Sequence, residues 1–467
     1  MLSERIGRFG RLTDSPATFG LVGARVIDPT NGADAVRDLA VVEGRIADLS
    51  HLPDAAPRLD AAGLVVAPAF VDLHTHLREP GGTDAEDMES GTRAAAHGGY
   101  ATVCAMPNTD PMLDEPARVG WVVSRARDVG ASRVRVIGAI TVGRRGESLT
   151  DIGALVSAGA VAFSDDGASV PSARLARSAL SYLAGIGGLL IEHAEEPTLA
   201  AGTLMRAGPT AIRLGLAGWP ASAELTIVER DIALAEEIGA RLHLTHLSTA
   251  AALDAVRRAR DRGAAVTCDV TPHHLALTDR WVAGDRRFAW DPEAEFVSAF
   301  EDGLDPERAY DSMCRVNPPL PSRADALALL AGLADGTIDA IATDHAPHPP
   351  HRKSVPFVDA APGMIGLETA LSLGLAAVEA GAVSLPQVLA ALTAGPARIL
   401  DRPCGLEPGM EAELVAFDPV ARWTVDASVF ASRSANTPLL GMQLPGLVRL
   451  TLAAGRVTWD DGLLAAG

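Results

Sequence analysis

The sequence predicts an α/β protein built around a (β/α)₈ TIM-like barrel, with β-rich segments at both chain ends. In the middle of the chain, short apolar runs alternate with helical segments, which is typical of parallel strands covered by helices on both faces. Near both ends, short runs are separated by clusters of turn residues instead. A third observation is that polar residues repeatedly close the apolar runs of the middle part.

The β-rich parts are residues 1–66 and residues 399–467. Near the start, the run 21–27 is followed by Asp28-Pro29-Thr30-Asn31-Gly32, a cluster of residues that favour turns. Near the end, the run 412–417 is followed by Asp418-Pro419 in the same way. We therefore expect short strands and tight turns in both parts.

The barrel is predicted over residues 67–398, although its first run starts slightly earlier. Eight strand–helix units over roughly 330 residues lie within the size range of this fold, and a doubly wound open sheet stays the alternative. A long acidic connection, residues 278–313, is expected to be a surface excursion. The predicted strands are 65–73, 101–106, 133–140, 160–166, 189–193, 241–247, 265–270 and 338–344.

The composition excludes several classes of function. Only one of the 40 basic residues is a lysine, Lys353, and it does not follow a glycine, so a phosphate-binding P-loop is excluded. The formal net charge of −19 argues against nucleic acid as a partner. No run of 18 apolar residues predicts a membrane span, and no secretory signal precedes residue 20. Four widely spaced cysteines indicate a reduced, cytoplasmic protein.

Histidines and aspartates stand where the predicted strands end. The first run closes with Asp72-Leu73-His74-Thr75-His76, and residues i and i+2 of a strand point to the same side. Barrel active sites lie at the C-terminal ends of the strands, so these side chains converge on one mouth. The candidate metal ligands are His74, His76, Asp166, His193, His246 and Asp344.

Six ligands exceed what one tetrahedral zinc with an open position needs, so two ions sharing a bridging carboxylate are predicted. In the fourth run, alternation puts Ala162, Ser164 and Asp166 on one face of the strand and Phe163 and Asp165 on the other. The small side chains should line the crowded mouth. We therefore choose Asp166 as the bridge and expect Asp165 to cap a helix or to support the site.

These residues resemble the metal-binding signature of dihydroorotases, in the amidohydrolase superfamily. The resemblance starts at His74-Thr75-His76-Leu77-Arg78-Glu79-Pro80-Gly81 and continues in order through the central part. The later matching blocks are residues 86–93, 106–109, 163–167, 271–274, 316–320, 342–348 and 366–369.

The resemblance implies two Zn²⁺ ions per chain, bridged by Asp166 and a hydroxide, since one class of dihydroorotases uses an aspartate where many relatives use a modified lysine. It implies the reversible cyclisation of N-carbamoyl-L-aspartate to dihydroorotate in pyrimidine synthesis, with Asp344 as the general acid and base. It also implies that the two chain ends join in a small β-sandwich domain.

A substrate carboxylate needs fixed donors. Arg78 lies two residues beyond His76 and can pair with a carboxylate, unless it forms a surface ion pair with Glu79 or Asp84. By the family pattern, the substrate-binding residues are His76, Arg78, Asn108, Asn317, His348, Pro362 and Gly363. The family usually has an aromatic residue where Pro362 stands, so the contacts with the substrate ring differ there.

Two other functions stay open. One is another cyclic amidohydrolase, such as a hydantoinase, dihydropyrimidinase or allantoinase, although Arg78 and the single lysine argue against these. The other is a non-catalytic scaffold for aspartate transcarbamoylase, which the complete set of ligands argues against. We expect a small-molecule substrate, while a homodimer and an association with aspartate transcarbamoylase stay open.

Overall fold

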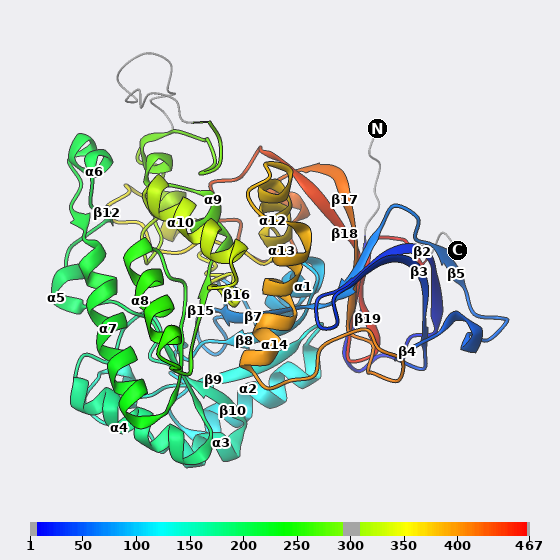
Figure 1. The fold of residues 1–467 in the computed structure, drawn as a ribbon, viewed down its shortest axis with the longest axis horizontal. Helices are drawn as coiled ribbons and strands as arrows, with labels where there is room; N and C mark the ends of the chain where they lie inside the picture. The colour runs from blue at the N-terminus through cyan, green and yellow to red at the C-terminus, as the bar shows by residue number, and fades with distance from the viewer. Residues whose placement is uncertain (1–6, 293–308, 465–467) are drawn as a thin grey trace.

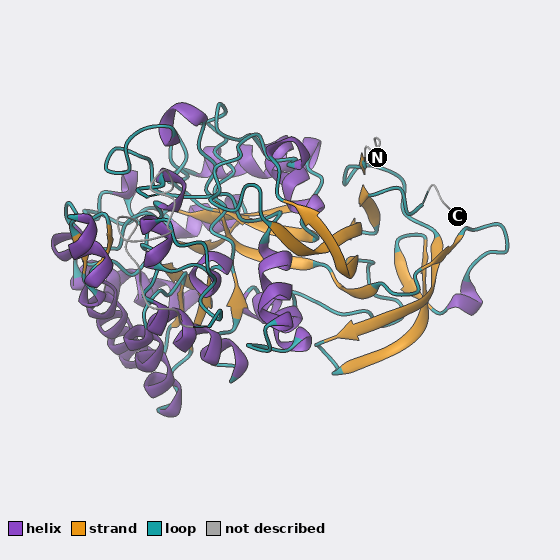
Figure 2. Ribbon diagram, turned by 90° about the horizontal axis from the view of Figure 1, so that it is seen from above, coloured by secondary structure: helices purple, strands orange, loops and turns teal. Residues whose placement is uncertain are grey.

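The computed structural model describes residues 7–292 and 309–464 of the chain. A barrel of parallel strands occupies the larger part, and a strand-rich domain that contains both chain ends lies beside it (Figure 1). Seen from above, helices surround the barrel, whereas the second part consists mostly of strands and loops (Figure 2). The predicted fold class is confirmed.

The barrel is an eight-stranded parallel sheet in the order β16-β15-β14-β11-β10-β9-β8-β7. A parallel bridge between Thr75 and His345 brings its two outer strands together, and the His76 amide donates to the His345 carbonyl over 2.8 Å. The open-sheet alternative is therefore wrong. The strands are β7 (Phe70–Thr75), β8 (Tyr100–Ala105), β9 (Arg133–Gly138), β10 (Ala160–Phe163), β11 (Leu189–Glu192), β14 (Arg241–Leu244), β15 (Val266–Val270) and β16 (Ala340–Ile341).

Helices cover the outside of the barrel because each buries one apolar stripe against the strands. In α8, for example, Leu253 and Val256 are buried, and the Thr249 side chain caps the first turn by accepting from the Ala252 amide. The main helices are α1 (Met88–His97), α2 (Pro116–Val129), α3 (Ile152–Ala158), α4 (Ala173–Ile186), α7 (Ala221–Ile238), α8 (Ala250–Asp261), α10 (Arg323–Ala334), α12 (Ala370–Glu379), α13 (Leu385–Leu392) and α14 (Ala394–Ile399).

Side chains fill the barrel interior, so the functional residues have to gather at one of its ends. Leu73, Ile137, Ala162 and Ile191 form one small apolar cluster with residues of the other strands. Phe163 belongs instead to the large cluster shared by strands and helices. The alternation predicted for the fourth run is therefore confirmed for Ala162 and Phe163.

The two chain ends join in one nine-stranded sheet, in the order β1-β19-β18-β17-β6-β2-β3-β4 with β5 beside β2. Its own apolar cluster includes Leu21, Val26, Leu414 and Leu450, so residues from both ends share one core. The strands are β1 (Arg8–Phe9), β2 (Phe19–Asp28), β3 (Ala33–Val42), β4 (Arg45–Ala47), β5 (Arg58–Asp60), β6 (Val65–Pro68), β17 (Leu414–Thr424), β18 (Gln443–Ala453) and β19 (Arg456–Asp460).

Three sequence predictions need correction. The run 65–73 is not one strand, because β6 pairs with β2 and β17 in the composite sheet and β7 starts the barrel. The boundary predicted after residue 66 consequently falls inside β6. In the connection 278–313, Trp281 is fully buried, so the described part is not a mere surface excursion. Residues 293–308 of this connection lie outside the described residues.

The described helices include none that is both long and apolar enough to span a membrane.

Candidate metal centre and active site

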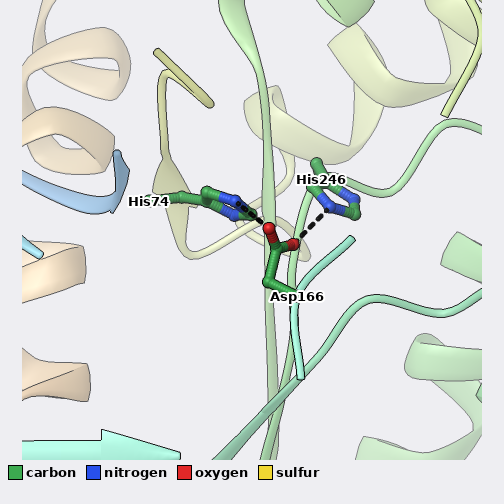
Figure 3. A group of neighbouring side chains, drawn as sticks. All are labelled: His74, Asp166 and His246. Carbon is green, nitrogen blue, oxygen red and sulfur yellow. Dashed lines mark ion pairs between the residues drawn. The ribbon is translucent and has the colours of Figure 1, made fainter. Parts of the chain in front are cut away.

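The six candidate ligands meet at the carboxyl end of the barrel, and all six are buried. His74 and His76 come from the end of β7, and the other four follow β10, β11, β14 and β16. Figure 3 shows the Asp166 carboxylate between the rings of His74 and His246. The ligand atoms of His74, Asp166 and His246 lie within 4.8 Å of one another, as do those of His74, His76 and Asp344. The fold thus brings together side chains that are up to 270 residues apart.

Asp166 divides the six residues into two groups. Its Oδ2 faces His74 and His76, with distances of 3.2 and 3.5 Å to their Nε2 atoms. Its Oδ1 faces His246 Nε2 at 3.5 Å and His193 Nδ1 at 3.6 Å. Asp344 belongs to the first group, because its Oδ1 lies 3.0 Å from His76 Nε2 and 3.4 Å from His74 Nε2.

This centre has the donor set and the charge that divalent cations bind. His74 Nε2 and Asp166 Oδ1 are buried and have no hydrogen-bond partner among the described residues, although buried polar atoms almost always have one. Imidazole nitrogens with carboxylate oxygens are the ligands of zinc and similar ions. The residues present therefore fit a metal centre.

The pKa values of the candidate ligands also indicate a metal centre. Burial lowers the pKa of His74, but the charges of Asp166 and Asp344 outweigh it and raise the pKa to about 9. Burial likewise lowers the pKa of His193, and its contacts with Asp166 and Glu195 raise it to about 10. Burial raises the pKa of Asp166, while the surrounding histidines hold it well below its usual range. The carboxylates thus favour positive charge at the centre, which a bound cation would supply.

Asp269 at the end of β15 orients two of the histidines. Its Oδ1 accepts a hydrogen bond from the His246 amide at 2.6 Å. Thr245 Oγ1 donates to Asp269 Oδ2 at 3.1 Å and lies 2.9 Å from His74 Nδ1. The same Oδ2 lies 2.8 Å from His243 Nε2, so His243 is packed in this network. Such outer contacts fix the ring orientation of metal-binding histidines.

The backbone at the mouth is strained at two of the candidate ligands. His246 and Asp344 have φ values of +41° and +46°, which residues with a side chain seldom adopt. Next to Asp344, the Thr343 amide donates to Asp72 Oδ1 at 3.0 Å, and the Thr343 hydroxyl donates to Asp72 Oδ2. Asp72 therefore joins the last barrel strand to the first and holds the Asp344 backbone in place.

Asp165 points away from the histidines. Its Oδ1 accepts from the amides of Ile140 and Thr141, at 2.9 and 3.0 Å, and the Thr141 hydroxyl donates to its Oδ2. It fixes the loop that follows β9, a supporting position, and does not cap a helix. Of the two aspartates, the structure places only Asp166 between the histidines.

Arg78 lies at the mouth with no ion-pair partner among the described residues. Its Nε donates to the Pro347 carbonyl at 3.1 Å, and its Nη2 lies 3.5 Å from His348 Nε2. Glu79 pairs instead with Arg125, at 3.0 Å, so the surface ion pair considered for Arg78 does not form with Glu79. Burial lowers the pKa of Arg78 to about 10, with the charges of Asp344, Asp166 and Glu86 opposing the shift.

The other predicted substrate residues surround the same mouth. Asn108 Oδ1 lies 2.8 Å from His76 Nδ1, and Asn317 Nδ2 lies 3.4 Å from His193 Nε2. His348 Nε2 donates to the Pro362 carbonyl at 2.8 Å. At Gly363 a side chain would not fit, since φ is +132° and a Cβ would lie 2.7 Å from Ala346 Cβ. The structure therefore brings all seven predicted residues to one place.

The sequence interpretation missed several supporting residues. Asp269 carries a usable signal, because an aspartate inside the apolar run 265–270 has to find a buried partner. Glu86, whose Oε2 lies 3.3 Å from His345 Nε2, and Asn436, which hydrogen-bonds His348, carry no local signal. Their roles depend on contacts between residues far apart in the chain.

Comparison with known proteins agrees with this geometry. The family described as "Dihydro-orotase-like" matches residues 63–252, and the "Amidohydrolase family" matches residues 223–458. A dihydroorotase of Mycobacterium tuberculosis is 45% identical over 439 residues, which cover 92% of this chain and 96% of that protein. The chain belongs to the dihydroorotase family of the amidohydrolases. It is therefore a hydrolase, and the sequence resemblance is confirmed.

Further dihydroorotases and solved structures are similar over nearly the whole chain. A dihydroorotase of Anaeromyxobacter dehalogenans is 44% identical, covering 94% of this chain and 97% of that protein. Among solved structures, an L-hydantoinase from Arthrobacter aurescens superposes with a TM-score of 0.79 at 25% identity, covering 95% of this chain and 96% of that chain. A dihydropyrimidinase from Brevibacillus agri has a TM-score of 0.76 at 19% identity, covering 95% of each chain. The dihydroorotase fold of this chain is thus shared with hydantoinases.

Proposed function

We propose that this protein is a zinc-dependent dihydroorotase that interconverts N-carbamoyl-L-aspartate and dihydroorotate, a step of pyrimidine synthesis. The observation that carries the proposal is Arg78, a partly buried guanidinium beside the candidate metal centre, without a carboxylate partner among the described residues. A buried charge normally has a counter-charge, and the substrate carboxylate would supply it. Hydantoin and dihydrouracil lack this ring carboxylate, so Arg78 favours dihydroorotate over them.

The residues that would hold two Zn²⁺ ions are those of the two groups around Asp166. His74, His76 and Asp344 would bind one ion, His193 and His246 the other, and Asp166 would bridge both through its two oxygens. When bound, such ions lower the pKa of a water molecule and polarise a carbonyl oxygen. The lone lysine lies elsewhere, so the bridge is proposed to be this aspartate.

The protein itself would bind the substrate and move one proton. Arg78 and Asn108 would bind the carboxylate, while Asn317, His348 and the backbone at Pro362 and Gly363 would contact the ring. In hydrolysis, the Asp344 carboxylate would accept the proton of the attacking water and deliver it to the ring nitrogen that leaves. Burial raises the pKa of Asp344, but His74 and His76 lower it further than burial raises it, so the carboxylate is ionised. The biosynthetic direction runs the same steps in reverse.

Dihydroorotate hydrolysis, measured together with the zinc content of the purified protein, tests this proposal. We expect turnover of dihydroorotate and two zinc ions per chain. Preferred turnover of hydantoin or dihydrouracil would show a different cyclic amidohydrolase. Less than one zinc per chain, with no activity after zinc is added, would show the non-catalytic scaffold instead.

We also propose a cytoplasmic location. The cysteines Cys104, Cys268, Cys314 and Cys404 are all unpaired, which is typical of a reducing compartment. Self-association and binding to aspartate transcarbamoylase are separate predictions. Light scattering of the protein alone, and then mixed with the transcarbamoylase, measures both.

A further inference from the structure

The single lysine of the chain is buried beside the substrate pocket. In the sequence, Lys353 lies nine residues after Asp344. It ends the short helix α11 (Pro350–Lys353), and none of its surface is exposed. A lysine is almost never buried this completely without a specific set of partners.

All partners of the Lys353 ammonium are backbone carbonyl oxygens. Its Nζ donates to the carbonyls of Ala361 at 2.9 Å, Gly363 at 3.1 Å and Arg315 at 3.2 Å. An ammonium has three N–H donors, so these three bonds use all of them. No carboxylate lies within ion-pair distance of it among the described residues.

These carbonyls belong to two segments that form one side of the proposed pocket. Arg315 lies two residues before Asn317, and Ala361 and Gly363 flank Pro362. The Gly363 amide also donates to the Arg315 carbonyl at 2.9 Å, so the two segments lie directly against each other. Three segments carry predicted contacts with the substrate ring. Lys353 connects two of them, the segment of Asn317 and the segment of Pro362 and Gly363, but not the segment of His348.

Asn436, from the C-terminal part, connects the remaining segment. Its Nδ2 donates to the carbonyls of Gly363 at 3.1 Å and Ala346 at 3.0 Å, and its Oδ1 accepts from the His348 amide at 3.0 Å. The Gly363 carbonyl therefore accepts from both Lys353 and Asn436. The Gly363 carbonyl thus joins the hydrogen bonds of Lys353 to those of Asn436, at a residue where a side chain would not fit.

We propose that Lys353 is a positioning residue that, together with Asn436, fixes the segments of Asn317, Pro362 and Gly363 at the distance that the substrate ring requires. A purely structural role explains the charge poorly, because an apolar side chain of the same length would fill the space without burying an ammonium. Three charge-assisted hydrogen bonds to one pocket wall restrict its movement in a way that apolar packing does not. This inference rests on the proposed function, since it concerns the same pocket.

The test compares Lys353→Met with a matched control at the other end of the barrel. Arg260 also donates to two backbone carbonyls, of Val266 at 3.0 Å and Thr337 at 2.7 Å, and pairs in addition with Asp339, but it lines a cavity at the amino end of the barrel. For Lys353→Met we expect at least a tenfold rise in the KM for dihydroorotate, a kcat within threefold of wild type and unchanged zinc content. Lys353→Arg should recover part of the KM. Arg260→Met should lower Tm and leave the KM unchanged.

A KM within twofold of wild type in folded, zinc-loaded Lys353→Met would overturn the inference. If that variant does not fold, the wild-type protein provides the test, since ¹⁵N-labelled lysine gives a single side-chain resonance. We expect this resonance to shift when dihydroorotate is added, and an unchanged resonance at saturation would overturn the inference. If the wild-type enzyme turns over hydantoin and not dihydroorotate, the proposed function fails, and the KM comparison is made with hydantoin.

Discussion

The two ends of the barrel differ in whether their arginines have carboxylate partners. At the amino end, Arg133 pairs with Glu411 and Glu413, and Arg402 pairs with Glu413 as well. At the carboxyl end, Arg78 has no carboxylate partner among the described residues, and buried atoms of His74 and Asp166 lack hydrogen-bond partners. The paired charges connect the barrel with the composite sheet, whereas the unpaired ones are available to a metal ion and a substrate.

The amino end also holds cavities, although its charges are paired. Cavities of about 300 and 460 Å³ open at the amino end, the first lined by Arg133, Arg402 and Glu413 and the second by Arg241 and Asp339. In the second cavity, Arg241 pairs with Asp401 and Arg260 with Asp339. The difference teaches that convergent ligand side chains beside an arginine without a carboxylate partner, and not the presence of a cavity, mark the site in this protein.

The largest effect is expected from Asp166→Ala. Of the carboxylates in the described part of the chain, only Asp166 faces both groups of histidines, so both ions should bind weakly without it. We expect zinc content below one ion per chain and a loss of dihydroorotate turnover on the order of 1,000-fold or more, since metal catalysis supplies several kcal/mol. Metal analysis and an activity assay of the same sample check this. Two zinc ions in the variant would show that the bridge is another residue.

The second prediction is that Arg78→Met keeps the metal and loses the substrate. Removing a partly buried charged donor should reduce kcat/KM for dihydroorotate by roughly 100-fold, the equivalent of about 2–3 kcal/mol. Zinc content should stay at the wild-type value, because Arg78 contacts none of the proposed ligands by a hydrogen bond. Normal affinity for dihydroorotate in this variant would remove Arg78 from the carboxylate site.

A smaller effect is expected from Asp269→Asn, which keeps the shape of the side chain and removes its charge. The variant should bind zinc roughly 10- to 100-fold more weakly, because Asp269 orients the backbone of His246 and, through Thr245, the ring of His74. Competition with a chelator of known affinity measures the change. An unchanged zinc affinity would limit Asp269 to a role in folding.

The smallest effect on activity is expected at the amino end. Glu413→Gln removes the ion pairs with Arg133 and Arg402, both partly exposed, and should cost about 1 kcal/mol of stability. We expect Tm to fall by a few degrees and kcat/KM to stay within twofold of wild type. A large loss of activity with unchanged Tm would contradict the contrast between the two ends.

Several features of the fold and the site could be predicted from local sequence. The alternation of side chains along a strand is a local property, so it separates Asp166 from Asp165 without any knowledge of the fold. The position of a residue at the end of a parallel strand is also local, and in a barrel all such ends meet. For these reasons the six candidate ligands, the barrel and its mouth follow from the sequence.

Only the tertiary structure decides the features that depend on partners far apart in the chain. Whether residues 65–73 form one strand or two depends on β2 and β17. These two strands pair with the first half of the run, one on each side, and so draw it into the composite sheet. In the same way, Lys353 is buried because the carbonyls of residues 315, 361 and 363 meet around it. Strand ends and side-chain alternation are set by neighbours in the sequence, whereas burial and hydrogen-bond partners are set by contacts that exist only after folding.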